Sequence, residues 1–160
     1  MWAPGINRVQ VTVVVALVLQ TACGLPKNAT HAVGIRSQSK FYVQMNVAAA
    51  ANSNNPVPMD LVFVLDKKLI KEIGKLAAKD WFERRIQIQR DYATTTEIIS
   101  WEFVPGQHTG AISIDVHPKA KAAFLFANYL SPGENRAVVD IRVPVVVNLM
   151  EEGFTVQPLR

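Results

Sequence analysis

The chain has 160 residues, with 17 Lys and Arg against 13 Asp and Glu, and a single cysteine. A formal charge of +4 spread along the chain is too small to indicate nucleic-acid binding. One cysteine excludes an internal disulfide, and a chain of this length buries enough surface to form one stable domain without a disulfide or a metal.

The first feature is an apolar run that ends at the cysteine, Val9–Cys23 (VQVTVVVALVLQTAC). It is shorter than the about 20 apolar residues that a membrane-spanning helix needs. It has the proportions of a signal-peptide core, because Arg8 precedes it and the small residues Thr21 and Ala22 stand at its end. Residues 1–22 are therefore predicted to be a signal peptide.

The surroundings of Cys23 resemble the processing site of bacterial lipoproteins, in which the cysteine is acylated and becomes the mature N-terminus. Ala22 and Leu19 fit that pattern, whereas Gln20 stands where it prefers Leu. Several acyl chains on one cysteine anchor a protein stably. Gly24 is not the Asp that retains lipoproteins in the inner membrane, so the resemblance implies the outer membrane. An ordinary cleaved signal and an uncleaved helix are the alternatives.

A tether and then a folded domain follow. Gly24–Ser39 has no apolar period and is rich in small and polar residues, so residues 23–39 are predicted to be the lipidated N-terminus and a flexible tether. Residues 40–160 are predicted to form the domain. Its first strand is half-buried, because apolar residues alternate with polar ones at Phe41, Val43, Met45 and Val47.

A long loop is expected at Ala48–Pro58, where Asn, Ser and Pro favour turns. Long ordered loops in compact domains tend to be functional. The next strand, Leu61–Leu65, is apolar on both faces and should be covered on both sides.

A helical insertion at about 66–91 supplies the cover for the second face. Asp66 is predicted to cap a first helix. Asp80 with Glu83 matches a capping box, which predicts a second helix from Trp81 to about Arg90. We expect its buried residues to be Trp81, Phe82 and Ile86. Its exposed side should carry Arg84, Arg85 and Arg90 as a solvated face, with a partner patch as the alternative.

The rest of the chain again has the two-residue period of strands. Short apolar segments are separated by turns such as Pro105-Gly106 and Ser131-Pro132-Gly133, and Lys121–Tyr129 is apolar on both faces. Alternation is also seen in Val139, Ile141 and Val143. The count is seven or eight strands. The sequence therefore predicts a mainly β protein, an antiparallel β-sandwich with a helical insertion after its second strand.

No catalytic or metal site is expected. Ser113, Asp115 and His117 share one strand face, but at about 3.3 Å per residue the serine and histidine lie about 13 Å apart, too far for a triad. His108 and His117 have no further ligands to complete a metal set. Phosphate-loop and nucleophile-elbow motifs are absent from the sequence. The protein is predicted not to be an enzyme and to need no cofactor or small-molecule substrate.

In the order of its features the chain resembles the outer-membrane lipoproteins of type VI secretion systems, the TssJ (VasD-like) family. The likeness covers residues 41–158. It rests on Cys23, the loop that leads into LVFVL, the Asp80-Trp81-Phe82 segment, the EFVPGQ segment at 102–107 and the strand at 122–129.

That resemblance implies a transthyretin-like β-sandwich, held by its acyl chains on the outer membrane and facing the periplasm. Its implied role is structural: the loop between the first two strands docks onto the periplasmic domain of the inner-membrane subunit TssM. By position the loop residues are Asn52, Ser53, Asn54, Asn55, Pro56 and Pro58. The alternative is a periplasmic lipoprotein that binds a small ligand or peptidoglycan, although no strand face combines aromatic and carboxylate residues for such a site.

Overall fold

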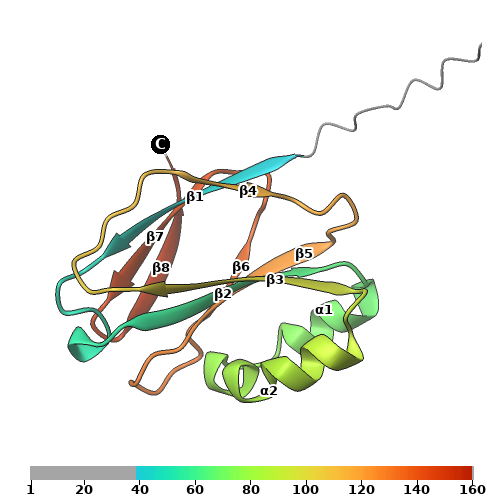
Figure 1. Cartoon of the computed structure of the whole chain (residues 1–160), viewed down its shortest axis with the longest axis horizontal. Helices are drawn as coiled ribbons and strands as arrows, with labels where there is room; N and C mark the ends of the chain where they lie inside the picture. The colour runs from blue at the N-terminus through green and yellow to red at the C-terminus, as the bar shows by residue number, and fades with distance from the viewer. Residues whose placement is uncertain (1–38, 160) are drawn as a thin grey trace, which may run out of the picture. The chain divides into compact units, whose positions relative to one another are not determined.

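The computed structural model describes residues 39–159, so the predicted signal peptide, Cys23 and all but the last residue of the tether lie outside the described residues. Within these residues, eight strands and two α-helices follow one another (Figure 1). They are β1 (Lys40–Val47), β2 (Val57–Val64), α1 (Lys67–Ile73), α2 (Ala78–Asp91), β3 (Thr96–Phe103), β4 (Ile112–Asp115), β5 (Ala122–Ala127), β6 (Arg136–Val139), β7 (Val145–Met150) and β8 (Gly153–Pro158), with a short helical turn, η1 (Ala51–Asn54), between β1 and β2.

The strands form two four-stranded sheets, in the orders β4-β1-β7-β8 and β3-β2-β5-β6. The predicted sandwich and the insertion after the second strand are confirmed. One pair differs from the antiparallel expectation, since β1 and β7 run parallel, with Val43 opposite Val145. Hairpin-like turns reveal antiparallel neighbours in a sequence, whereas strands about a hundred residues apart leave no such signal.

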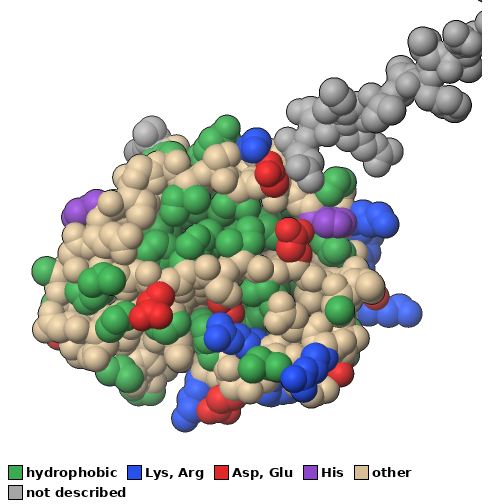
Figure 2. Space-filling view, in the orientation of Figure 1, with side chains coloured by type: hydrophobic (Ala, Val, Ile, Leu, Met, Phe, Trp, Pro, Cys, Tyr) green, Lys and Arg blue, Asp and Glu red, His purple; other side chains and the backbone are tan. Residues whose placement is uncertain are grey.

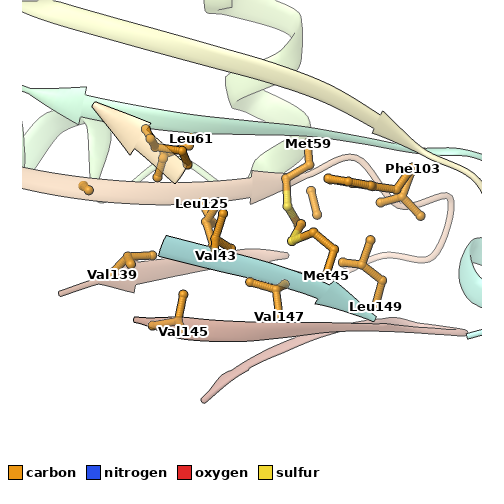
Figure 3. Packing of buried hydrophobic residues seen from close by; sticks show 14 of the residues in the cluster. Val43, Met45, Met59, Leu61, Phe103, Leu125, Val139, Val145, Val147 and Leu149 are labelled. Carbon is orange, nitrogen blue, oxygen red and sulfur yellow. The ribbon is translucent and has the colours of Figure 1, made fainter. Parts of the chain in front are cut away.

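The main core lies between the sheets. The alternating residues Phe41, Val43, Met45 and Val47 of β1 are all buried, as predicted. Figure 3 shows Met45 and Met59 pointing toward each other from opposite sheets, beside Phe103 and Leu149. The polar residues between them, such as Tyr42 and Gln44, face outward because successive side chains of a strand alternate between its faces.

A second core lies on the outer face of the β3-β2-β5-β6 sheet, which α1 and α2 cover (Figure 1). Val62 and Val64 of β2 pack there against the helices, while Leu61 and Phe63 of the same strand face the main core. Trp81 stacks on Phe126 with ring centroids 4.9 Å apart. The doubly apolar β2 segment is therefore covered on both faces, as the sequence predicts.

The two helices start differently from one another. Asp66 caps α1 as predicted, because its carboxylate accepts a hydrogen bond from the Lys68 backbone at 2.9 Å. The capping-box prediction for α2 is wrong. The helix begins at Ala78, and Asp80 lies inside its first turn. The backbone N–H of Ala78 instead donates to the Glu134 carbonyl at 2.8 Å, a partner supplied by a distant segment.

The predicted buried face of α2 is only partly correct. Trp81 is fully buried and Phe82 is half-buried, but Ile86 is 61% exposed, and Ile88 is buried in its place. Residue 86 lies about 140° around the helix from Trp81, whereas residue 88 returns to the same side. Arg85, expected on the solvated face, turns inward to a carboxylate of the sheet.

The predicted strand through Val139, Ile141 and Val143 ends early. β6 stops at Val139, and the following residues form a turn. The Asp140 carboxylate accepts hydrogen bonds from both the backbone and the side chain of Arg142, and these bonds keep the pKa of Asp140 low, at about 2. This local pairing competes with continued strand formation.

Neither described helix is long and apolar enough to cross a membrane.

Candidate functional site

The loop between β1 and β2 is an ordered projection with an unusual backbone. Asn52, Ser53 and Asn54 have φ values of 49°, 53° and 63°, three successive residues in the left-handed region. A left-handed residue other than glycine is unfavourable by about 1–2 kcal/mol, and Asn tolerates it best. Strain of this kind is concentrated at functional sites.

Asn52 supports this backbone from below. Its side chain is 3% exposed, and its Nδ2 donates to the Pro56 carbonyl at 2.8 Å. Its Oδ1 accepts from the Leu130 backbone N–H at 2.7 Å, which joins the loop to the segment after β5. The family resemblance implies that Asn52 is a partner-binding residue, and in the structure its side chain is turned into the fold.

The other predicted loop residues divide into two groups. Asn55 closes the loop, since its Nδ2 donates to the carbonyls of Asn52 and Ser53 at 3.2 and 3.0 Å. Ser53, Asn54 and Pro56 are exposed and project outward. Pro58 is not in the loop: it is half-buried in β2, in register with Glu102.

Exposed apolar side chains surround the loop at the same end of the sandwich. Leu130, Val104 and Met150 are 72%, 57% and 43% exposed. Hydrogen bonds hold these segments near the loop. The Leu130 N–H donates to Asn52 Oδ1. The Ala48 N–H donates to the Leu149 carbonyl, beside Met150, and the Gly106 N–H, two residues after Val104, donates to the Ala48 carbonyl. The sequence gives no sign that these three residues share one end of the fold, because they stand beside turns and strand ends that are far apart along the chain.

A shallow hollow of about 480 Å³ adjoins the loop on one side. It lies between the ends of β1 and β7 and the segment before β4, and its wall includes Asn46, Ala48, His108 and Met150. The Asn46 side chain donates to the Asn148 amide oxygen at 3.1 Å, so these two polar side chains of the wall are paired with each other. The surface suits contact with a protein segment.

Beneath Leu130 lies the buried ring of Tyr129. Burial raises the pKa of its hydroxyl to about 12, and the nearby Met150 backbone opposes this effect. The hydroxyl makes no hydrogen bond of ordinary geometry among the described residues. The group therefore stays neutral at physiological pH and carries no charge into the loop surface.

Asp115 and His117, which the sequence places too far from Ser113 and from each other for a triad, each bind another partner. Asp115 forms an ion pair with Lys40 at 2.6 Å, which raises the pKa of the lysine. His117 Nδ1 accepts from the Lys119 backbone at 3.1 Å. Within residues 39–159, no three His, Cys, Asp or Glu side chains are grouped as a metal site would require.

No protein-family model and no curated protein matches this chain. Several solved structures match it. The type VI secretion lipoprotein TssJ1 from Pseudomonas aeruginosa superposes with a TM-score of 0.63 at 13% identity, over 77% of this chain and 98% of that one. A chain of the "Type VI membrane complex" gives 0.59 at 14% identity, over 76% and 99%. A chain of the structure "T6SS protein TssM C-terminal domain (869-1107) from EAEC" gives 0.57 at 13% identity, over 75% and 98%.

At these identities the likeness establishes the fold. The chain has the fold of a type VI secretion lipoprotein, along nearly the whole length of the matched chains. The fold expected from the family resemblance is confirmed.

Proposed function

We propose that this protein is a lipid-anchored structural subunit of a type VI secretion membrane complex. In this role it sits on the outer membrane, faces the periplasm and docks the periplasmic domain of the inner-membrane subunit TssM. The observation that carries the proposal is the TssJ-like fold over about three quarters of the chain, with a TssJ1 lipoprotein and a type VI membrane complex among the similar structures.

The loop between β1 and β2 is the docking element in this proposal. It offers the exposed polar residues Ser53 and Asn54 at its tip, and Leu130, Val104 and Met150 supply apolar contact area around it. Contiguous exposed apolar surface is typical of protein interfaces. Because Asn52 and Asn55 already hold the loop in shape, little ordering entropy is lost on binding.

The anchor in this proposal is Cys23, acylated after removal of residues 1–22, with residues 24–39 as the tether. In this proposal the protein is a scaffold that links the membrane to the partner, and it carries out no reaction. The hollow beside the loop supports no second proposal, since it is shallow and its Asn46 and Asn148 side chains are paired with each other.

The test is a double substitution at the loop tip, Ser53→Gly with Asn54→Gly, in the full-length protein. Glycine keeps the positive φ without strain, so the loop backbone is retained while both side chains are removed. We expect binding to the periplasmic domain of the cognate TssM to weaken by about tenfold or more, as for contacts at the centre of an interface. Biolayer interferometry measures the affinity.

Ser113→Ala is the matched control, because Ser113 is an exposed serine outside the loop, on β4 at the edge of the β4-β1-β7-β8 sheet. The control should bind as the wild type does, and both variants should keep the wild-type melting temperature. Full affinity of the folded double variant would show that this loop is not the interface.

A further inference from the structure

The chain enters the domain at the end of the sandwich opposite the docking loop. The Ser39 carbonyl accepts a hydrogen bond from Val116 at 2.9 Å, and Lys40 is in register with Asp115. From there β1 runs to Val47, where the loop begins (Figure 1). The point of attachment and the loop are thus separated by the full length of a strand.

Lysines are concentrated at this entry end. Lys119 and Lys121 lie in the segment between β4 and β5, and the Lys121 N–H donates to the Val64 carbonyl at 2.8 Å. Because β2 ends at Val64, α1 starts close by and adds more lysines. We call the exposed set of Lys67, Lys68, Lys71, Lys119 and Lys121 the basic end.

In Figure 2 blue side chains lie along the right-hand side, below the place where the chain enters, and also along the bottom over the helices, whereas none is visible at the left-hand end where η1 lies. The acidic neighbours of the basic end are already engaged. Asp115 pairs with Lys40, Asp140 pairs with Arg142, and Asp66 caps α1. Two further carboxylates lie nearby, Glu97, half-buried on β3, and Glu72, exposed on α1 four residues after Lys68. Among the described residues, none of the five lysines takes part in an ion pair.

The loop end carries the opposite charge. Glu151 and Glu152 form the turn between β7 and β8, and Glu102 lies opposite Pro58 near the start of β2. Glu134 also lies at this end, paired with Arg136. Lys79 and Asp80 line a hollow with Leu130 at this end and offset one another, so carboxylates outnumber basic groups here and the charge changes sign along the direction of β1.

We infer that the basic end docks on the anionic phospholipid headgroups of the membrane that holds the anchor, and so points the docking loop away from the bilayer. The inference rests on the proposed acylation of Cys23. Lysines clustered beside a membrane attachment are attracted to anionic lipid, over a distance of about 8 Å at physiological ionic strength.

The tether makes this contact effectively intramolecular. Residues 24–39 span at most about 3.5 Å each, so the basic end stays within about 55 Å of the anchor. A binding event within one tethered molecule has a high effective concentration. An acidic protein lacks this advantage, and we therefore assign the surface to lipid.

The experiment uses full-length protein purified from membranes, with acylation of Cys23 verified first by acyl labelling. It is reconstituted into vesicles of phosphatidylcholine alone, or with about 30% phosphatidylglycerol as the anionic lipid. A donor dye is placed on Pro118→Cys at the basic end or on Leu130→Cys at the loop end, and energy transfer to a headgroup acceptor is measured.

With anionic lipid we expect transfer from position 118 to be at least about twice that from position 130, and the difference to vanish near 1 M salt, where screening shortens the range to about 3 Å. The triple variant Lys67→Gln, Lys119→Gln, Lys121→Gln should abolish the difference. The matched control Lys75→Gln, Lys79→Gln, Arg84→Gln removes the same charge from the rest of the insertion and should preserve it.

Several results would overturn the inference. Two results would overturn it while leaving TssM docking intact. In one, acylated protein shows equal energy transfer from both positions in anionic vesicles. In the other, both triple variants change the energy transfer equally. Weakened TssM binding in the first triple variant, without any lipid dependence, would assign the lysines to an acidic protein. Unacylated wild-type protein would overturn the anchor and this inference together.

Discussion

At the scale of single residues, the most consequential group is Asp60. It is fully buried in the central strand β2, and its carboxylate accepts hydrogen bonds from Trp81 Nε1 at 2.9 Å and from Arg85 at about 3.3 Å. A buried charge is tolerated only when it is paired and hydrogen-bonded. Asp60 therefore fastens α2 to the sheet at a defined position.

We expect Arg85→Ala to lower the free energy of unfolding by about 2 kcal/mol, because it leaves a buried carboxylate with Trp81 as its single remaining hydrogen-bond partner. The value is below that for a fully buried pair, since the Arg85 side chain is 40% exposed. Its guanidinium also lies over the Phe82 ring at 5.1 Å, and that contact is lost as well. Urea unfolding measures the change.

Arg84→Ala is the matched control. Arg84 is the preceding residue of the same helix, is exposed and forms no ion pair with another described residue. Its substitution should change stability by less than about 0.5 kcal/mol. Equal effects of the two substitutions would show that the pair with Asp60 contributes nothing to stability.

At the scale of elements, the end of α1 is decided by a close approach to the sheet. Gly74 follows the helix, and a Cβ there would lie 2.7 Å from the Ile70 carbonyl oxygen and 3.1 Å from the Phe124 ring. The first of these neighbours is backbone and cannot rotate away. Absence of a side chain at residue 74 is therefore what allows α1 to end directly against β5.

We expect Gly74→Ala to destabilise the protein by about 1–3 kcal/mol through overpacking. Gly110→Ala is the control, since a Cβ at Gly110 meets nothing within 4 Å. Thermal unfolding of both variants makes the comparison. A Gly74→Ala protein as stable as the control would mean that α1 can shift without cost.

At the scale of the whole domain, β2 and β5 join its two cores. Neighbouring residues of one strand serve different cores: Leu61 and Leu125 face the other sheet, whereas Val62 and Phe124 face the helices. Loss of either core thus removes one covering from the same two strands. This sharing should make the insertion and the sandwich unfold as one cooperative unit.

Native-state hydrogen exchange tests this cooperativity. Peptides from α2 and from β7 should become labelled at the same denaturant concentration, because both wait for global unfolding. The turn at residues 131–135 is the internal control and should exchange in the native state, since its backbone N–H groups donate to no other group among the described residues. Labelling of α2 well before β7 would show that the helical insertion opens alone.

The sequence by itself determined the features that depend on near neighbours. The alternation in β1, the doubly apolar β2 and the Asp66 cap are all recognisable, because strand period, burial and capping act within a few residues. The position of the loop is also set locally, since Asn is the residue that best tolerates its left-handed backbone.

Only the tertiary structure decided the features that depend on distant groups. Asn52 turns inward because Leu130 offers a donor, and α2 starts early because Glu134 offers an acceptor. The parallel β1–β7 pair and the gathering of the basic end likewise bring together segments far apart in the chain. A hydrogen bond or a charge acts through space, so the partner it finds depends on how the sheets stack, which no local pattern specifies.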